Sequence, residues 1–61
     1  MSSQTNSALA EQVRAACLRA AQAAYEEGGW LGLCQQGRFE LAMEAIIALN
    51  LDALIESSKH Q

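Results

Sequence analysis

Apolar residues recur every three or four positions through the first half of the chain. No glycine or proline interrupts residues 8–27. The repeating positions are Leu9, Val13, Ala16, Cys17, Ala20 and Ala24, with Leu18 and Tyr25 beside them. This spacing is that of one face of an amphipathic α-helix. The pattern predicts a long helix over residues 7–27 that is capped by Asn6 or Ser7 and ended by Gly28-Gly29.

Two shorter helical segments are expected after the paired glycines. Residues 29–36 are long enough for two turns, and Gly37 should separate them from an apolar helix over residues 38–49. In that helix, Phe39, Met43 and Ile46 share one face, and most other positions are also apolar. A helix that is apolar on nearly all sides needs burial on more than one side. A last turn is expected over residues 51–57.

The composition favours helix throughout. The chain has twelve alanines, no proline and five β-branched residues, which are too few for a sheet. The fold class expected is therefore all-α, as a helical hairpin or three-helix arrangement. Residues 7–57 should form a single helical domain between a flexible polar arm (1–6) and a frayed tail (58–61).

The apolar content exceeds what one chain of 61 residues is expected to bury. A chain of this size hides only about 60% of the surface that it exposes when unfolded, so its core is marginal without a partner. The surplus predicts self-association, with a homodimer favoured. The residues expected at the interface are Trp30, Phe39, Met43, Ile46 and Ile47. For Trp30 and Phe39, which lie near Arg38, packing in the corner between two helices is favoured over contact with a partner, and both roles hold if that corner is itself at the dimer interface.

Few side chains indicate chemistry, and no catalytic, cofactor-binding or metal-binding residues are expected. Cys17 and Cys34 are far apart in sequence and belong to no CxxC pair, and the only histidine is His60, whereas zinc usually takes four ligands. Both cysteines are interpreted as small buried hydrophobic residues. A redox role for Cys34 is the alternative. Glu40 and Glu44 share a helical face, but acid–base catalysis also needs a pocket that excludes water.

The charge pattern argues against nucleic acid as a partner. The net charge is −3, and the four basic residues are scattered along the chain, whereas phosphate binding needs a clustered basic face. No apolar stretch approaches the roughly 20 residues that a membrane-spanning helix requires. The N-terminal residues are polar and unlike a signal peptide, so a cytoplasmic location is expected.

Three short motifs carry a resemblance to a known group of proteins. They are Ala24-Tyr25-Glu26, then Gly32-Leu33-Cys34, and then Gly37-Arg38 with Glu40 and Ala42. This AYE…GLC..GR.E.A pattern resembles a group of short bacterial helical proteins, some of which carry an acetyltransferase label. The resemblance covers about two-thirds of the chain and implies a bacterial cytoplasmic protein. An acetyl-CoA-dependent transferase needs a sheet and a pyrophosphate-binding loop, and the sequence predicts neither.

The function expected is therefore protein–protein interaction without catalysis: a small regulator, adaptor or assembly subunit that associates with itself, another protein or both. Two alternatives stay open. One is an accessory subunit of an enzyme complex, and the other is a thiol-based sensor that uses Cys34.

Overall fold

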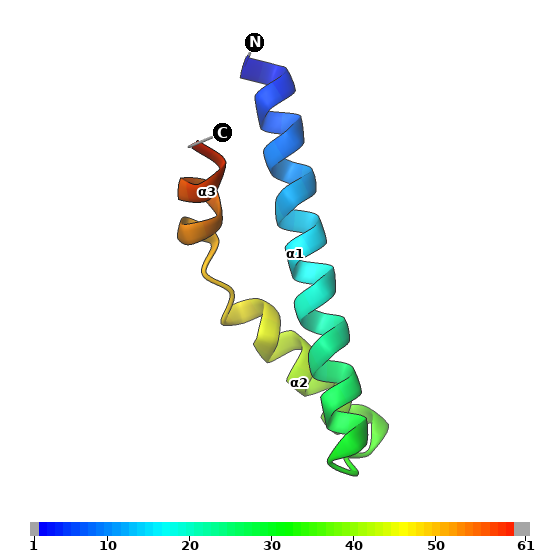
Figure 1. The fold of residues 1–61 in the computed structure, drawn as a ribbon. Helices are drawn as coiled ribbons and strands as arrows, with labels where there is room; N and C mark the ends of the chain where they lie inside the picture. The colour runs from blue at the N-terminus through cyan, green and yellow to red at the C-terminus, as the bar shows by residue number, and fades with distance from the viewer. Residues whose placement is uncertain (1, 60–61) are drawn as a thin grey trace.

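The part of the chain that the structure describes forms three helices joined by short connections. The structure is a computed structural model that describes residues 2–59. In chain order the helices are α1 (Ser2–Trp30), α2 (Gln35–Ile47) and α3 (Leu51–Lys59). Helices α1 and α2 form an antiparallel hairpin, and α3 continues back along α1 (Figure 1). No strand occurs among the described residues, so the prediction of an all-α fold is confirmed.

Helix α1 is longer at both ends than the sequence pattern predicted. It continues through Gly28 and Gly29 to Trp30, so the expected stop at the paired glycines is wrong. The residue that takes the left-handed conformation is Gly32, with φ +81°. The Leu33 N–H donates to the Gly28 carbonyl (2.9 Å) and the Gly32 N–H to the Gly29 carbonyl (3.1 Å). These two bonds are the Schellman pattern, which satisfies the last carbonyls of a helix.

The N-terminal end of α1 also differs from the expected boundary. Residues 2–6 were expected to form a flexible arm, but they are helical, so neither Asn6 nor Ser7 is the N-cap. Nothing in this segment breaks a helix, and serine, threonine and asparagine each cost only some tenths of a kcal/mol in a helix interior. Residue 1 of the expected arm and residues 60–61 of the expected tail lie outside the described residues.

The short helix expected over residues 29–36 does not form. Residues 31–34 make a turn, and α2 begins at Gln35 with Cys34 as its N-cap residue. Gly37, expected to separate two helices, lies inside α2. A β-carbon at Gly37 would lie 3.3 Å from the Leu33 Cβ, so the glycine lets the turn fold back onto the first turn of α2.

The third helix begins where the sequence predicted a last helical segment. Helix α2 ends at Ile47, two residues before the expected end, and α3 runs from Leu51 past the expected end at residue 57 to Lys59. The Asn50 side chain accepts a hydrogen bond from the Ala53 N–H at 3.0 Å. Asn50 therefore caps α3, which is a preferred role for asparagine at a helix start.

Helices α1 and α2 meet through their smallest side chains. Ala24 and Gly28 of α1 and Ala42 of α2 are buried. A β-carbon at Gly28 would lie 3.3 Å from the Leu41 Cδ1 and 3.4 Å from the Arg38 Cα. The absence of a side chain at Gly28 therefore lets the two backbones approach closely where the hairpin closes.

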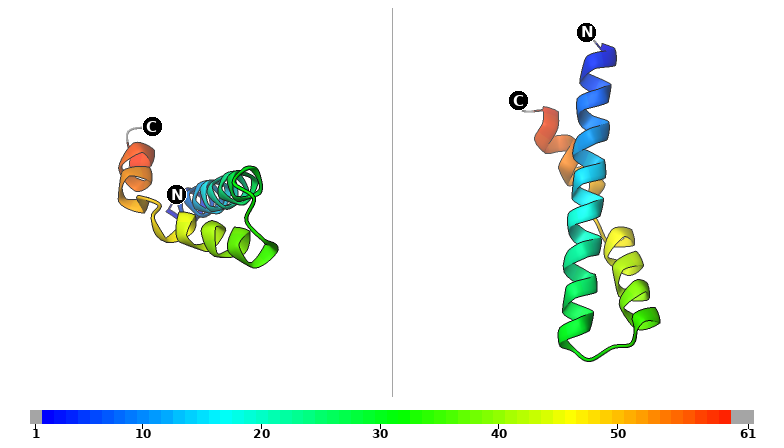
Figure 2. Two further views of the ribbon diagram at one scale, coloured as in Figure 1. Left: turned by 90° about the horizontal axis from the view of Figure 1, so that it is seen from below. Right: turned by 90° about the vertical axis from the view of Figure 1, so that its right-hand side faces the viewer.

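The hairpin encloses almost no core. Among the side chains that the structure describes, Ala24 and Ala42 are the only buried apolar ones, and none is fully buried. The molecule measures 47 × 17 × 14 Å, and its radius of gyration is 14.2 Å, against about 10.5 Å for a compact chain of this length. The right-hand view of Figure 2 shows the same long, thin outline, whereas the left-hand view looks nearly along α1. The fold thus lacks the layer that would cover its large apolar residues.

Replacing Gly32 tests whether the left-handed turn closes the hairpin. Nothing lies within 4 Å of a β-carbon at this position, so the cost of Gly32→Ala comes from the backbone conformation alone. We expect a loss of about 1–2 kcal/mol in the free energy of unfolding. Urea unfolding followed by circular dichroism, at one fixed protein concentration, measures it. Gly32→Asn should lose less, because asparagine tolerates this conformation, and an equal loss in both variants would contradict the explanation.

Candidate interaction surface

Arg38 holds the two helices of the hairpin at their closed end. Its Nε donates a hydrogen bond to the Leu33 carbonyl at 3.1 Å, and its Cζ lies 5.7 Å from the centre of the Tyr25 ring. Its Cγ would be 3.2 Å from a β-carbon at Gly28, so the aliphatic part of the side chain lies against α1. One side chain thus contacts α1 and the turn and lies over the Tyr25 ring.

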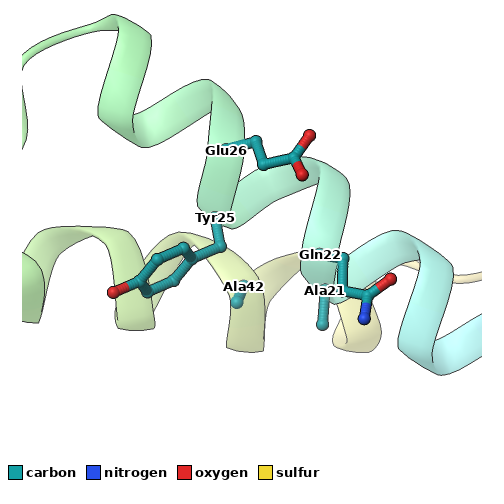
Figure 3. A pocket seen from close by; sticks show the side chains of 5 residues that line it. All are labelled: Ala21, Gln22, Tyr25, Glu26 and Ala42. Atoms are coloured by element: carbon teal, nitrogen blue, oxygen red, sulfur yellow. The ribbon is translucent and has the colours of Figure 1, made fainter.

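A shallow hollow opens beside this contact, between α1 and α2. Its volume is about 450 Å³, and it is lined by Ala21, Gln22, Tyr25 and Glu26 of α1 and by Ala42 of α2. In Figure 3 the Tyr25 ring extends toward α2, whereas the Glu26 carboxylate points away from α2. The two alanines are too small to fill the space between the helices. The hollow is therefore a groove with an apolar floor, and it is open to solvent.

The large exposed apolar residues of α2 lie on the same side of the hairpin as this groove. Tyr25 directly follows the buried Ala24, and Met43 directly follows the buried Ala42. Both helices are right-handed, and they run antiparallel, so one step forward from the contact line turns toward the same side in each. Phe39 lies four residues before Met43 and therefore shares its stripe.

We call this side the groove face, and we define it by eight residues. They are Leu18, Ala21 and Tyr25 of α1 and Phe39, Ala42, Met43, Ile46 and Ile47 of α2. Four of them are large and exposed, with relative exposures of 56% for Leu18, 57% for Phe39, 39% for Met43 and 81% for Ile47. A contiguous apolar surface of this kind is unusual on a monomer and marks interaction sites.

The structure brings together four of the five residues predicted to form an interface. Phe39, Met43 and Ile47 form an exposed stripe along α2, and the half-buried Ile46 lies beside them. Trp30 does not join them. It is 82% exposed at the end of α1, and its position five residues after Tyr25 turns it away from the groove face.

The prediction that Trp30 and Phe39 fill the corner between two helices is wrong. Phe39 is more than half exposed and Trp30 is almost fully exposed. Arg38 and Tyr25 occupy the corner instead. The sequence pattern predicted that Arg38 lies close to the turn between the helices. Nothing in that pattern predicted that its side chain would lie against α1. The spacing of seven between Leu18 and Tyr25 was the signal for the contribution of α1 to the groove face.

The two cysteines do not form a site. Cys17 is half-buried in α1, whereas Cys34 is exposed at the start of α2, so the interpretation of Cys34 as a buried hydrophobic residue is wrong. Both thiols are free. Within the described part of the chain, no group of three or more His, Cys, Asp or Glu side chains could hold a metal ion. His60 lies outside that part.

The charged side chains are spread over the surface of α1 and α2. Arg14 pairs with Glu11 at 2.8 Å on the exposed surface of α1, a contact worth about 0.2–1 kcal/mol. The Gln36 amide donates to the Glu40 carboxylate at 3.4 Å, and both side chains are exposed. Because the Arg38 side chain lies against α1 and the turn, α1 and α2 present no basic cluster. None of the described helices is long and apolar enough to cross a membrane.

Comparison of the chain with models of protein families, with curated proteins and with solved structures finds no match in any of the three. The resemblance to the acetyltransferase-labelled group therefore stays a prediction, and the argument for a function rests on the groove face.

Replacing Arg38 tests its role in closing the hairpin. Arg38→Met keeps the aliphatic stem against Gly28 but removes the hydrogen bond to Leu33 and the charge near Tyr25. We expect a loss of about 1–2 kcal/mol in the free energy of unfolding. Urea unfolding at a fixed protein concentration measures this loss. Arg14→Met, which removes only an exposed pair, is the matched control, and an equal effect of the two changes would argue against the role.

Proposed function

We propose that this chain is a protein–protein interaction module that associates with a second copy of itself through the groove face. The observation that carries the proposal is the exposed stripe of Phe39, Met43 and Ile47, which lies next to a groove floored by alanines. Covering such a stripe removes apolar surface from water, which is the main driving force of protein association.

The surface area of the chain supports this proposal. The structure exposes 4795 Å², whereas a compact monomer of this mass exposes about 3,900 Å². The excess is therefore about 900 Å² per chain. A standard protein interface buries about 800 Å² on each partner. One homodimeric interface of ordinary size would bring the exposed surface to that of a compact protein.

The biological role proposed for the dimer is that of a small regulator, adaptor or assembly subunit without catalysis of its own. The free thiols of Cys17 and Cys34 fit a reducing compartment, and we place the dimer in the cytoplasm. Trp30, which is turned away from the groove face, and Leu31, which is exposed in the turn after it, are available for contact with a different protein. Tryptophan is enriched among residues that dominate binding energy.

Sedimentation equilibrium over a hundredfold range of concentration tests the self-association. We expect a dimer for the unchanged chain and a monomer for Ile47→Asp. Burying an isoleucine contributes about 1.5–3 kcal/mol and the dimer contains two copies, so the dissociation constant should rise at least about a hundredfold. Because Ile47 is 81% exposed in the single chain, its replacement should leave the hairpin folded.

Glu44→Ala is the matched control, because Glu44 is exposed on the same helix but off the groove face. It should sediment as the unchanged chain does. A folded chain that stays monomeric at every concentration would reject the proposal. So would an Ile47→Asp variant that dimerises as strongly as the control.

A further inference from the structure

Two sets of residues share one symmetry level: the α1 set lies at the outer edge of the groove face, and the α2 set lies on the groove face itself. On α1, Arg19 lies three residues before Gln22, and Glu26 lies four residues after it. The midpoint of Arg19 and Glu26 therefore falls between Gln22 and Ala23. On α2, Phe39 and Ile47 lie four residues on either side of Met43. When a helix pairs antiparallel with its own copy, residues at equal distances on either side of the centre lie opposite each other. On α1 these residues carry unlike charges, and on α2 they are apolar, so each set suits such a pairing.

The register of the hairpin brings these two centres to the same height. A β-carbon at Gly28 would lie 3.4 Å from the Arg38 Cα, so these two residues face each other across the hairpin. The α1 centre lies about 8 Å before Gly28, and the α2 centre lies about 7.5 Å after Arg38, at a rise of about 1.5 Å per residue. Because the helices are antiparallel, these two steps run in the same direction. The two centres therefore lie at nearly one level, and a single axis can pass through both.

We infer that the second copy docks on the groove face about a two-fold axis that crosses the hairpin, perpendicular to its helices, at the level of Gln22 and Met43. The inference rests on the proposed self-association and specifies its geometry. Helix α1 packs antiparallel on the partner's α1, and α2 packs antiparallel on the partner's α2. The product is a four-helix bundle in which every neighbouring pair of helices is antiparallel, an arrangement that suits short loops.

The edge of this interface is complementary in charge. Arg19 of one copy lies opposite Glu26 of the other, and the symmetry repeats the pair. Both side chains are exposed in the single chain, and neither makes an ion pair among the residues that the structure describes. In the centre, Met43 meets its own copy, and Phe39 meets Ile47 of the second copy. Stacking the hairpins with α1 on the partner's α2 would satisfy neither arrangement.

A charge exchange tests the pairing of Arg19 with Glu26. Arg19→Glu and Glu26→Arg should each weaken the dimer roughly tenfold at low salt, because each change turns two attractive pairs into two repulsive ones. The double variant should return to within about twofold of the unchanged chain. Glu27→Arg is the control: it makes the same change in net charge on another side of α1 and should have little effect.

Cross-linking tests the position of the axis at Met43. In a Cys17→Ala, Cys34→Ser background that still dimerises, Met43→Cys should form a disulfide-linked dimer under mild oxidation. Its thiol would lie opposite its own copy, within the range of about 4.4–6.8 Å between Cα atoms that a disulfide needs. Glu44→Cys, one residue along and turned away, should not cross-link.

The outcomes separate this geometry from the proposed function. A dimer in which the double charge variant stays as weak as either single variant would overturn the geometry and leave self-association standing. A dimer in which Met43→Cys cross-links no better than Glu44→Cys would do the same. A monomer at all concentrations would overturn both.

Discussion

The close approach of α1 to α2 through small residues determines the rest of the structure. Where Ala24, Gly28 and Ala42 meet, no large side chain fits between the helices. Leu18, Phe39, Met43 and Ile47 are therefore displaced to the side of the hairpin instead of lying between its helices. The contact that closes the hairpin thus also creates its exposed apolar face. A wider spacing with leucines at the seam would give a conventional core and leave no such face.

The turn depends on the same region. Gly28 accepts the hydrogen bond of the Schellman turn through its carbonyl and receives the stem of Arg38 on its α-carbon. Arg38 in turn holds the Leu33 carbonyl and lies over Tyr25. The termination of α1, the start of α2 and the wall of the groove are consequently parts of one set of contacts. This explains why a hairpin with almost no core still has a defined register.

The helical class and the large apolar face of α2 could be predicted from the sequence, because both follow from residue spacing. The element boundaries near the hinge could not. Gly28-Gly29 has the composition of a helix end, but the advantage of close packing against α2 outweighs the roughly 1 kcal/mol that each glycine costs in a helix. Gly32 takes the left-handed conformation in the turn and Gly37 is helical within α2, although their composition alone marks both as possible helix breaks. Whether Trp30 lies on the groove face depends on which side of α1 meets α2, and local spacing alone does not determine this.

In the proposed dimer, the scarcity of buried apolar residues would link the persistence of the protein to its abundance. When a folded form is stabilised by its own partner, its apparent stability rises with concentration. In the proposed dimer, a copy without a partner presents an apolar stripe of the kind that chaperones and proteases recognise. At concentrations below the dissociation constant of the dimer, most copies would lack a partner and be removed. At concentrations above it, the protein would accumulate. The same alanines that bring the helices together would thereby set a threshold for the amount of protein that survives.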